Sequence, residues 1–79
     1  MSDSDKIMIM VEIVRFCESL RHKGQIMNRI ILNNVHAESY LSILTQQRLL
    51  MKNNGKYLRT KQGEDFLIVR DMFKKMIEK

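Results

Sequence analysis

Apolar residues recur at helical spacing over four stretches of the chain and predict four helices. The first is expected from Ser4 to about His22, with Ser4 or Asp5 as its cap and Gly24 as its stop. Apolar side chains surround much of this helix, a pattern typical of a helix buried on two sides. The set expected to face the domain core is Ile7, Met10, Val11, Val14 and Cys17. The set on the other faces, one of which can meet a second subunit, is Met8, Ile9, Ile13, Phe16 and Leu20.

Two shorter helical patterns follow, separated by a turn at Leu32-Asn33-Asn34. The first covers Gln25 to Leu32, and the second runs from Asn34 to about Arg48 with Asn33 as its N-cap. The second has an apolar face of Ala37, Leu41 and Leu44, with Tyr40 beside it. Its opposite face carries Val35, Ser39, Ser42 and Gln46. A short helix, a tight turn and an amphipathic helix predict a helix-turn-helix over about residues 25–48.

A change from helical spacing to alternation predicts a β-hairpin after the third helix. Leu49 to Lys52 and residues 56–59 flank Asn53-Asn54-Gly55, which tolerate the positive φ that a tight hairpin turn needs. Two strands are too few for an independent sheet, so we expect this wing, about residues 49–60, to pack against the helices. Thr60 then caps the last helix, predicted from Lys61 to Glu78.

The last helix carries more apolar surface than a domain of this size can cover. Phe66 and Leu67 are expected to complete the core, and the stripe continues beyond them at coiled-coil-like spacing. An exposed apolar stripe usually marks an interface, and small domains without disulfides often gain stability by oligomerisation. We therefore predict a homodimer built from the first and last helices. The expected interface residues are Ile9, Ile13, Phe16, Val69, Met72, Phe73 and Met76.

Composition and charge favour a binding function over catalysis. The net charge of +5, from 14 basic and 9 acidic residues, favours a polyanionic partner, with nucleic acid ahead of an anionic membrane. The longest apolar run, Ile7 to Val11, is too short to span a bilayer, and the start lacks the basic region of a signal peptide. The lone Cys17 fits a reducing, intracellular compartment, so we expect a cytoplasmic protein. No catalytic set, phosphate loop or zinc spacing occurs, so neither an enzyme nor a metal, cofactor or small-molecule substrate is expected.

Four short motifs, taken with this order of elements, resemble a known family. They are Ile26-Met27, Leu32-Asn33-Asn34, Tyr40–Leu44 and a junction from Tyr57 to Leu67 that contains Thr60 and Gly63. They are similar to motifs of the archaeal winged-helix DNA-binding domains, over about residues 7–70. The length allows a single domain over residues 1–79, and the resemblance implies that it is mainly α with a small β-hairpin in the order α-α-α-β-β-α. The resemblance also implies a small, basic, dimeric transcription regulator or nucleoid-associated protein, joined through its C-terminal helices (about residues 61–78).

In a winged helix, three groups of residues are expected to meet double-stranded DNA. The third helix offers Asn34, Val35, His36, Ser39 and Ser42. The wing offers Lys52, Asn53, Asn54 and Lys56. Arg29, Arg48 and Arg59 are placed to grip the flanking backbone.

The expected reading face of the third helix carries no Lys or Arg, and Glu38 lies beside it. Glu38 is expected to be repelled by phosphate or to point to solvent, although a carboxylate can also accept from a cytosine amino group. Affinity is therefore expected mainly from the wing and the flanks. The uncharged face also leaves open a different interpretation, a protein-interaction module on the same scaffold.

Four other polar or reactive residues have ordinary structural explanations. Asp71 and Lys75 are expected to form an i, i+4 ion pair on a solvated helix face. His22 is expected to be a cation at the end of the first helix, and Cys17 a small core residue.

Overall fold

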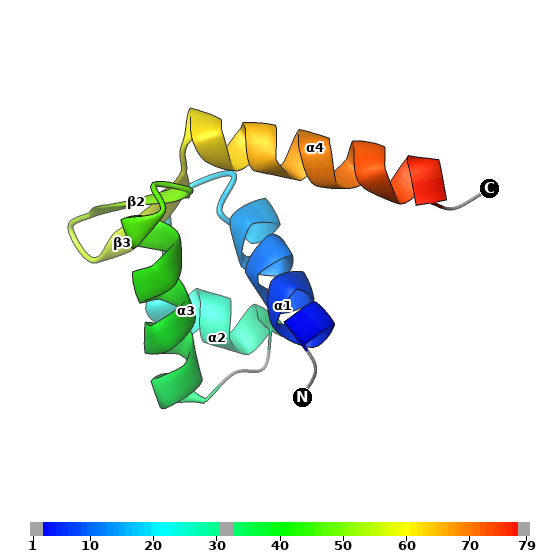
Figure 1. Ribbon diagram of the computed structural model, residues 1–79. Coiled ribbons are helices and arrows are strands. Elements are labelled where there is room, and N and C mark those ends of the chain that lie inside the picture. Colours follow the sequence, from blue (N-terminus) through cyan, green and yellow to red (C-terminus); the bar gives the residue numbers. More distant parts are fainter. Residues whose placement is uncertain (1–2, 31–32, 78–79) are drawn as a thin grey trace.

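The computed structural model describes residues 3–30 and 33–77, with side chains from Lys6 onward, and shows a helical protein with a small sheet (Figure 1). The predicted fold class, mainly α with a β-hairpin wing, is confirmed. In the described part of the chain, three antiparallel strands are present in the order β1-β3-β2. The elements are α1 (Asp3–Phe16), β1 (Arg21–His22), α2 (Lys23–Ile30), α3 (Asn34–Gln46), β2 (Leu50–Asn53), β3 (Lys56–Arg59) and α4 (Lys61–Ile77).

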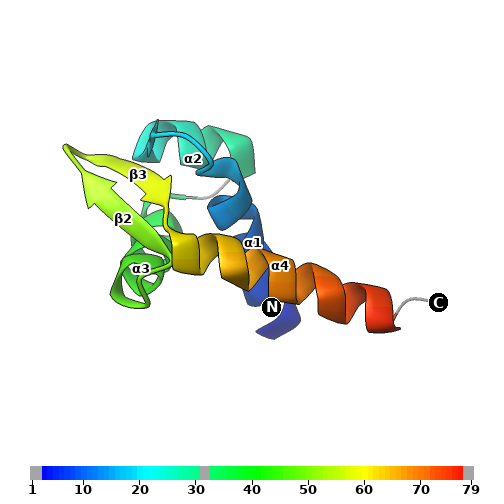
Figure 2. The ribbon, with the colours of Figure 1, turned by 90° about the horizontal axis from the view of Figure 1, so that it is seen from above.

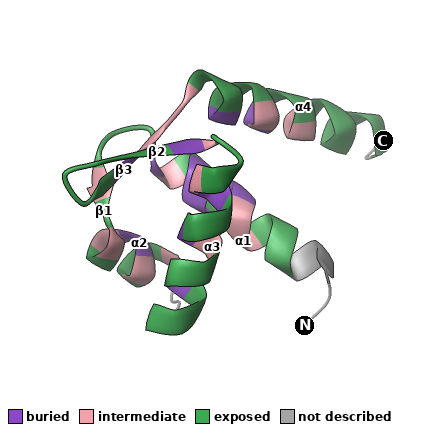
Figure 3. Cartoon of the chain, turned by 60° about the vertical axis from the view of Figure 1, so that its left-hand side comes forward, coloured by how far each residue is buried: buried purple, intermediate pink, exposed green. Residues whose placement is uncertain are grey.

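The hydrophobic core lies where α1, α2, α3, the hairpin and the start of α4 meet (Figure 3). Every element among them contributes at least one buried apolar side chain, so the core joins parts of the chain far apart in sequence. Its members are Val11, Ile13, Val14, Cys17, Ile26, Leu41, Leu44, Leu50, Tyr57 and Leu67. The predicted core faces of α1 and α3 are confirmed in large part, but Ile7 is exposed and Met10 only half-buried.

The first helix is shorter than its periodicity predicts, because the chain leaves it to join the sheet. α1 ends at Phe16 rather than at His22, and the Cys17 carbonyl accepts a hydrogen bond from the Arg59 N–H at 2.7 Å. Arg21 and His22 then form β1, which pairs with β3. A two-residue strand covers the edge of β3 that a lone hairpin would leave open. The expectation of two strands was therefore wrong.

His22 begins α2 instead of ending α1. Its Nδ1 accepts a hydrogen bond from the Gln25 N–H at 3.2 Å, and the Gln25 Oε1 accepts from the His22 N–H at 3.1 Å. This is the reciprocal arrangement of a capping box, and it requires the Nδ1 atom to be unprotonated. Gly24 lies within α2, so it is not the helix stop that its position suggested. The predicted end of this helix at Leu32 lies outside the described residues.

Both ends of α3 are fixed by local hydrogen bonds. The Asn33 side chain accepts from the His36 N–H at 2.8 Å, which confirms the predicted N-cap. At the other end the Leu49 N–H donates to the Leu44 carbonyl at 2.9 Å and the Arg48 N–H to the Thr45 carbonyl at 3.1 Å. These two bonds make a Schellman motif. Arg48 occupies its left-handed position with φ 62°, so α3 stops at Gln46 rather than at Arg48.

The wing is a tight hairpin whose turn chemistry the sequence predicted. Asn53 pairs with Lys56, which leaves Asn54 and Gly55 as a two-residue turn. Their φ angles of 53° and 77° are both positive, as a type I′ turn requires, and this turn matches the twist of the flanking strands.

Thr60 and Gly63 form a close junction between the wing and α4. The Thr60 hydroxyl accepts from the Gly63 N–H at 3.0 Å, which confirms the predicted cap, and donates to the Arg48 carbonyl at 2.6 Å. A Cβ on Gly63 would lie 2.3 Å from the Leu49 carbonyl oxygen. Glycine is therefore required at this position by the close approach of two backbones rather than by its φ angle.

Only the first half of α4 belongs to the domain core. Leu67 is buried and Phe66 packs against the core, as predicted. The second half extends past α1, away from the wing (Figures 1 and 2). Asp71 forms its ion pair with Arg15 of α1 rather than with Lys75. The pair therefore connects α1 to α4, whereas the expected pair would have lain within α4 alone. Glu78, the predicted end of the helix, lies outside the described residues.

Candidate nucleic-acid interface

The outer face of α3 presents the predicted contact residues to solvent. Val35 is the most open of them, with 73% of its surface accessible. Glu38 is the one charged residue within α3. The exposed residues of this face are Asn34, Val35, His36, Ser39 and Ser42. The helix therefore offers amide, hydroxyl, imidazole and apolar groups, but no cation.

The wing supplies cations beside this face. Lys52, Asn53, Asn54 and Lys56 are all exposed around the hairpin turn. The Lys52 ammonium lies 5.7 Å from the centre of the Tyr57 ring, within the range of a cation–π contact, so the strand below it helps to hold its position. The hairpin and α3 lie side by side at the same end of the molecule (Figures 1 and 2).

A shallow concavity separates α3 from the wing, and we call it the α3–wing notch. Its lining residues are Lys23, Glu38, Ser42, Thr45, Lys52, Gly55 and Tyr57. The Lys23 ammonium lies 2.9 Å from the Glu38 carboxylate, so Glu38 is exposed, as expected, but has a cationic partner within the chain. The sequence did not indicate Lys23 as a site residue. It follows β1 directly, and only the pairing of β1 with β3 places it beside the wing.

The sequence of residues 4–78 matches the family described as winged helix-turn-helix. The protein belongs to this family. No curated protein matches the chain. In winged-helix terms, α2 and α3 form the helix-turn-helix, and β2 with β3 forms the wing. The α3–wing notch then lies between the second helix of the helix-turn-helix and the wing.

The three arginines expected to flank the interface differ in their exposure to solvent and in their contacts within the protein. Arg59 is only 21% exposed in its side chain, lies 3.5 Å from the Glu64 carboxylate, and has a buried Nε with no hydrogen-bond partner among the described residues. Arg59 is thus held within the protomer, and its expected contact with DNA is not supported. Arg29 is exposed, with its guanidinium 5.9 Å from the centre of the Phe16 ring. Arg48 is exposed in a left-handed conformation.

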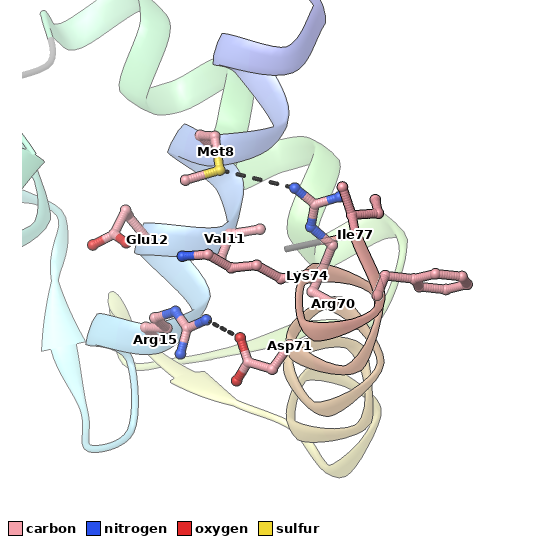
Figure 4. Close-up of a pocket in the computed structure, with 9 residues that line it drawn as sticks. Met8, Val11, Glu12, Arg15, Arg70, Asp71, Lys74 and Ile77 are labelled. Atoms are coloured by element: carbon pink, nitrogen blue, oxygen red, sulfur yellow. Dashed lines mark hydrogen bonds and ion pairs between the residues drawn. The ribbon is translucent and has the colours of Figure 1, made fainter. Parts of the chain in front are cut away.

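α4 forms one wall of a groove whose other wall is α1 (Figure 4). The groove has a volume of about 620 Å³ and is lined by both apolar and charged side chains. Arg15 and Asp71 pair across it, and the Arg70 guanidinium lies 3.8 Å from the Met8 sulfur. The groove residues are Met8, Val11, Glu12, Arg15, Arg70, Asp71, Phe73, Lys74 and Ile77.

The residues expected to join two copies divide into two groups. Val69, Met72, Phe73 and Met76 of α4 are all exposed, so they remain available to a partner. Ile13 has 0% of its surface accessible, and its place in the expected interface was wrong because it lies in the protomer's own core. Ile9 and Phe16 are half-buried and pack against the core. The free apolar residues of α1 are instead Ile7 and Met8.

Cys17 has no feature of a reactive thiol. It is fully buried, and this burial raises the pKa of the thiol from 9.0 to about 11, although Arg21 and Arg59 act in the opposite direction. A neutral buried thiol is a poor nucleophile and a poor metal ligand. Within residues 3–30 and 33–77, no group of three His, Cys, Asp or Glu side chains is arranged to hold a metal. No described helix is long and apolar enough to cross a membrane.

Proposed function

We propose that this winged-helix protein binds double-stranded DNA as a homodimer and regulates transcription. The observation that carries the proposal is the position of the wing beside the exposed face of α3, with Lys52 lining the notch between them and Lys56 exposed at the hairpin turn. α3 enters the major groove, and Lys52 and Lys56 contact phosphates on its flank. The net charge of +5 supplies the long-range attraction.

The chemistry of α3 supports limited discrimination between bases. Asn34 can pair with adenine, and the exposed Val35 side chain can contact a thymine methyl group. α3 contains no Lys or Arg, so the common contact of a cation with guanine is absent from this helix. Affinity comes chiefly from phosphate contacts of the wing, and base preference is correspondingly modest.

A duplex-binding titration at two salt concentrations tests the proposal. We expect affinity to fall steeply with salt, and K52A/K56A to reduce the slope of log K against log salt by about 2, since each lost phosphate contact removes ~0.9. The matched control is K6A/K75A, which removes the same charge from exposed positions outside the wing. No duplex binding by the parent protein at 50 mM salt would overturn the proposal and favour the protein-interaction alternative.

The second subunit is expected on the outer half of α4. Its exposed apolar residues continue onto Met8 of α1 across the groove of Figure 4. A contiguous apolar patch of this kind on a small protein usually marks an interface, unlike apolar residues scattered singly over a surface. A second copy covers the patch by pairing the same faces about a two-fold axis.

A further inference from the structure

The α3–wing notch already contains the parts of an anion site. Lys23 and Lys52 contribute two ammonium groups, and Ser42 contributes an exposed hydroxyl. They come from α2, β2 and α3, so three elements converge on one concavity. The Glu38 carboxylate, which also lines the notch, is the anion bound there, at 2.9 Å from the Lys23 ammonium.

We propose that the notch is a subsite for one backbone phosphate of DNA, and that in the free protein the Glu38 carboxylate occupies it in place of that phosphate. Duplex DNA displaces Glu38 from Lys23. The inference rests on the proposed function, because it assigns a phosphate to a particular place in that interface.

Because the Lys23–Glu38 ion pair is exposed, breaking it costs little free energy. The side chains of Lys23 and Glu38 are 35% and 61% accessible. Exposed pairs contribute little to stability, because water screens them and both side chains lose freedom by forming them. A phosphate also releases its condensed counterions when it meets a lysine, a gain that Glu38 does not offer.

The exchange also gives Glu38 a role that its charge alone does not explain. In the free protein Glu38 reduces the attraction of Lys23 for any anion, so a weak or isolated anion does not enter the notch. A duplex that docks the wing and α3 at the same time brings its phosphate to Lys23 at high effective concentration. Glu38 therefore lowers affinity for every duplex and leaves base preference unchanged.

A double-mutant cycle on the full chain measures the displacement. The four proteins are the parent, E38Q, K23Q and the double variant, titrated with one labelled duplex at low salt. If DNA breaks the Lys23–Glu38 pair, E38Q tightens binding ~5–10-fold when Lys23 is present but only ~2–3-fold when residue 23 is Gln, because an exposed pair is worth a few-fold. The control is E18Q, the same charge change at an exposed residue outside the notch, which leaves affinity nearly unchanged.

The outcomes separate the subsite from the function. Equal tightening by E38Q in both backgrounds, or none in either, overturns the displacement while leaving duplex binding intact. No duplex binding by any of the four proteins overturns the proposed function itself. Competition with inorganic phosphate at matched ionic strength distinguishes a free phosphate ion from a DNA backbone phosphate as the occupant of the notch. If the notch binds a backbone phosphate, inorganic phosphate leaves the duplex affinity unchanged. Displacement of the duplex by millimolar phosphate would assign the notch to a free anion instead.

Discussion

Arg48 holds a backbone conformation in which glycine is the usual residue. Its φ of 62° places it in the left-handed region at the end of α3, where a side chain crowds the adjoining carbonyl oxygen. The surrounding bonds hold it there, since its N–H donates to Thr45 and its carbonyl accepts from Thr60. Strained residues kept in place by their neighbours often have a function for their side chain.

Replacing Arg48 separates its strain from its charge. We expect R48G to raise the free energy of unfolding by ~0.5–1 kcal/mol, because glycine relieves the left-handed strain. R48G should also weaken duplex binding and reduce the salt slope by ~0.9 if the guanidinium holds a phosphate. R48K keeps both the strain and the charge and should change neither quantity. Urea unfolding and the duplex titration give the two measurements; a drop in stability with R48G would contradict the argument from strain.

Cys17 makes the stability of the fold sensitive to high pH. Burial raises the pKa of its thiol from 9.0 to about 11, so the folded protein keeps a proton that the unfolded chain releases. The stabilisation is therefore complete below pH 9 and is lost as the pH rises to about 11. We expect a loss of roughly 2–3 kcal/mol over that interval. The measurement is the difference in unfolding free energy between the parent and C17A as a function of pH, because taking the difference cancels the effects of other titrating groups. A difference that does not change between pH 9 and pH 11 would contradict the prediction.

At the scale of elements, α4 is positioned by the absence of one side chain. Gly63 lies in the first turn of α4 against the backbone of residue 49, and a Cβ there would lie 2.3 Å from the Leu49 carbonyl oxygen and 2.9 Å from the Arg59 Cγ. The clash with Leu49 involves a backbone atom that also accepts the Thr60 N–H, so it cannot move freely.

We expect G63A to lower the free energy of unfolding by ~1–3 kcal/mol. Overpacking against backbone outweighs the ~1 kcal/mol that alanine gains over glycine in a helix. The control is Q62A, at the neighbouring exposed position, which should be close to neutral. Thermal unfolding of both variants checks the expectation, and a G63A protein as stable as the parent would show that α4 can shift without cost.

Elements with local signals were predictable from the sequence. Asn33 caps α3, Asn54-Gly55 makes the turn of the wing, and Thr60 with Gly63 begins α4, each through bonds within a few residues. The end of α1 was not predictable, because helical periodicity continues to His22 while the open edge of β3 draws Arg21 and His22 into the sheet.

The candidate site divides in the same way. The exposed residues of α3 and the wing follow from amphipathic spacing and turn chemistry. Lys23 and its pairing with Glu38 depend on β1, which has only two residues and no recognisable pattern. Asp71 likewise bonds Arg15 of another helix instead of Lys75 one turn away, a choice that only tertiary packing decides.

For the whole molecule, the proposed dimer depends on the outer half of α4. Met72 is 59% exposed within an apolar stripe, and a charge at its centre should prevent a second copy from covering it. We expect the parent to scatter light as a dimer of 9.4 kDa chains at micromolar concentration, and M72E as a monomer. The matched control is V35E, the same chemical change on α3, which should remain a dimer but bind duplex poorly. A monomeric parent protein would refute the dimer.

The Thr60 hydroxyl joins the Arg48 carbonyl, just after α3, to the Gly63 N–H, in the first turn of α4, through hydrogen bonds of 2.6 Å and 3.0 Å. The orientation of α3, the helix proposed to enter the major groove, is thereby fixed relative to α4, the helix proposed to hold the two subunits together. In a dimer joined through α4, the distance between the two α3 helices is then fixed, and this distance sets the spacing of the DNA half-sites that the dimer accepts. Operators whose half-sites are one helical turn of DNA apart, ~10 base pairs or a multiple, fit such a dimer. A shift of half a turn places the second α3 on the wrong face of the duplex.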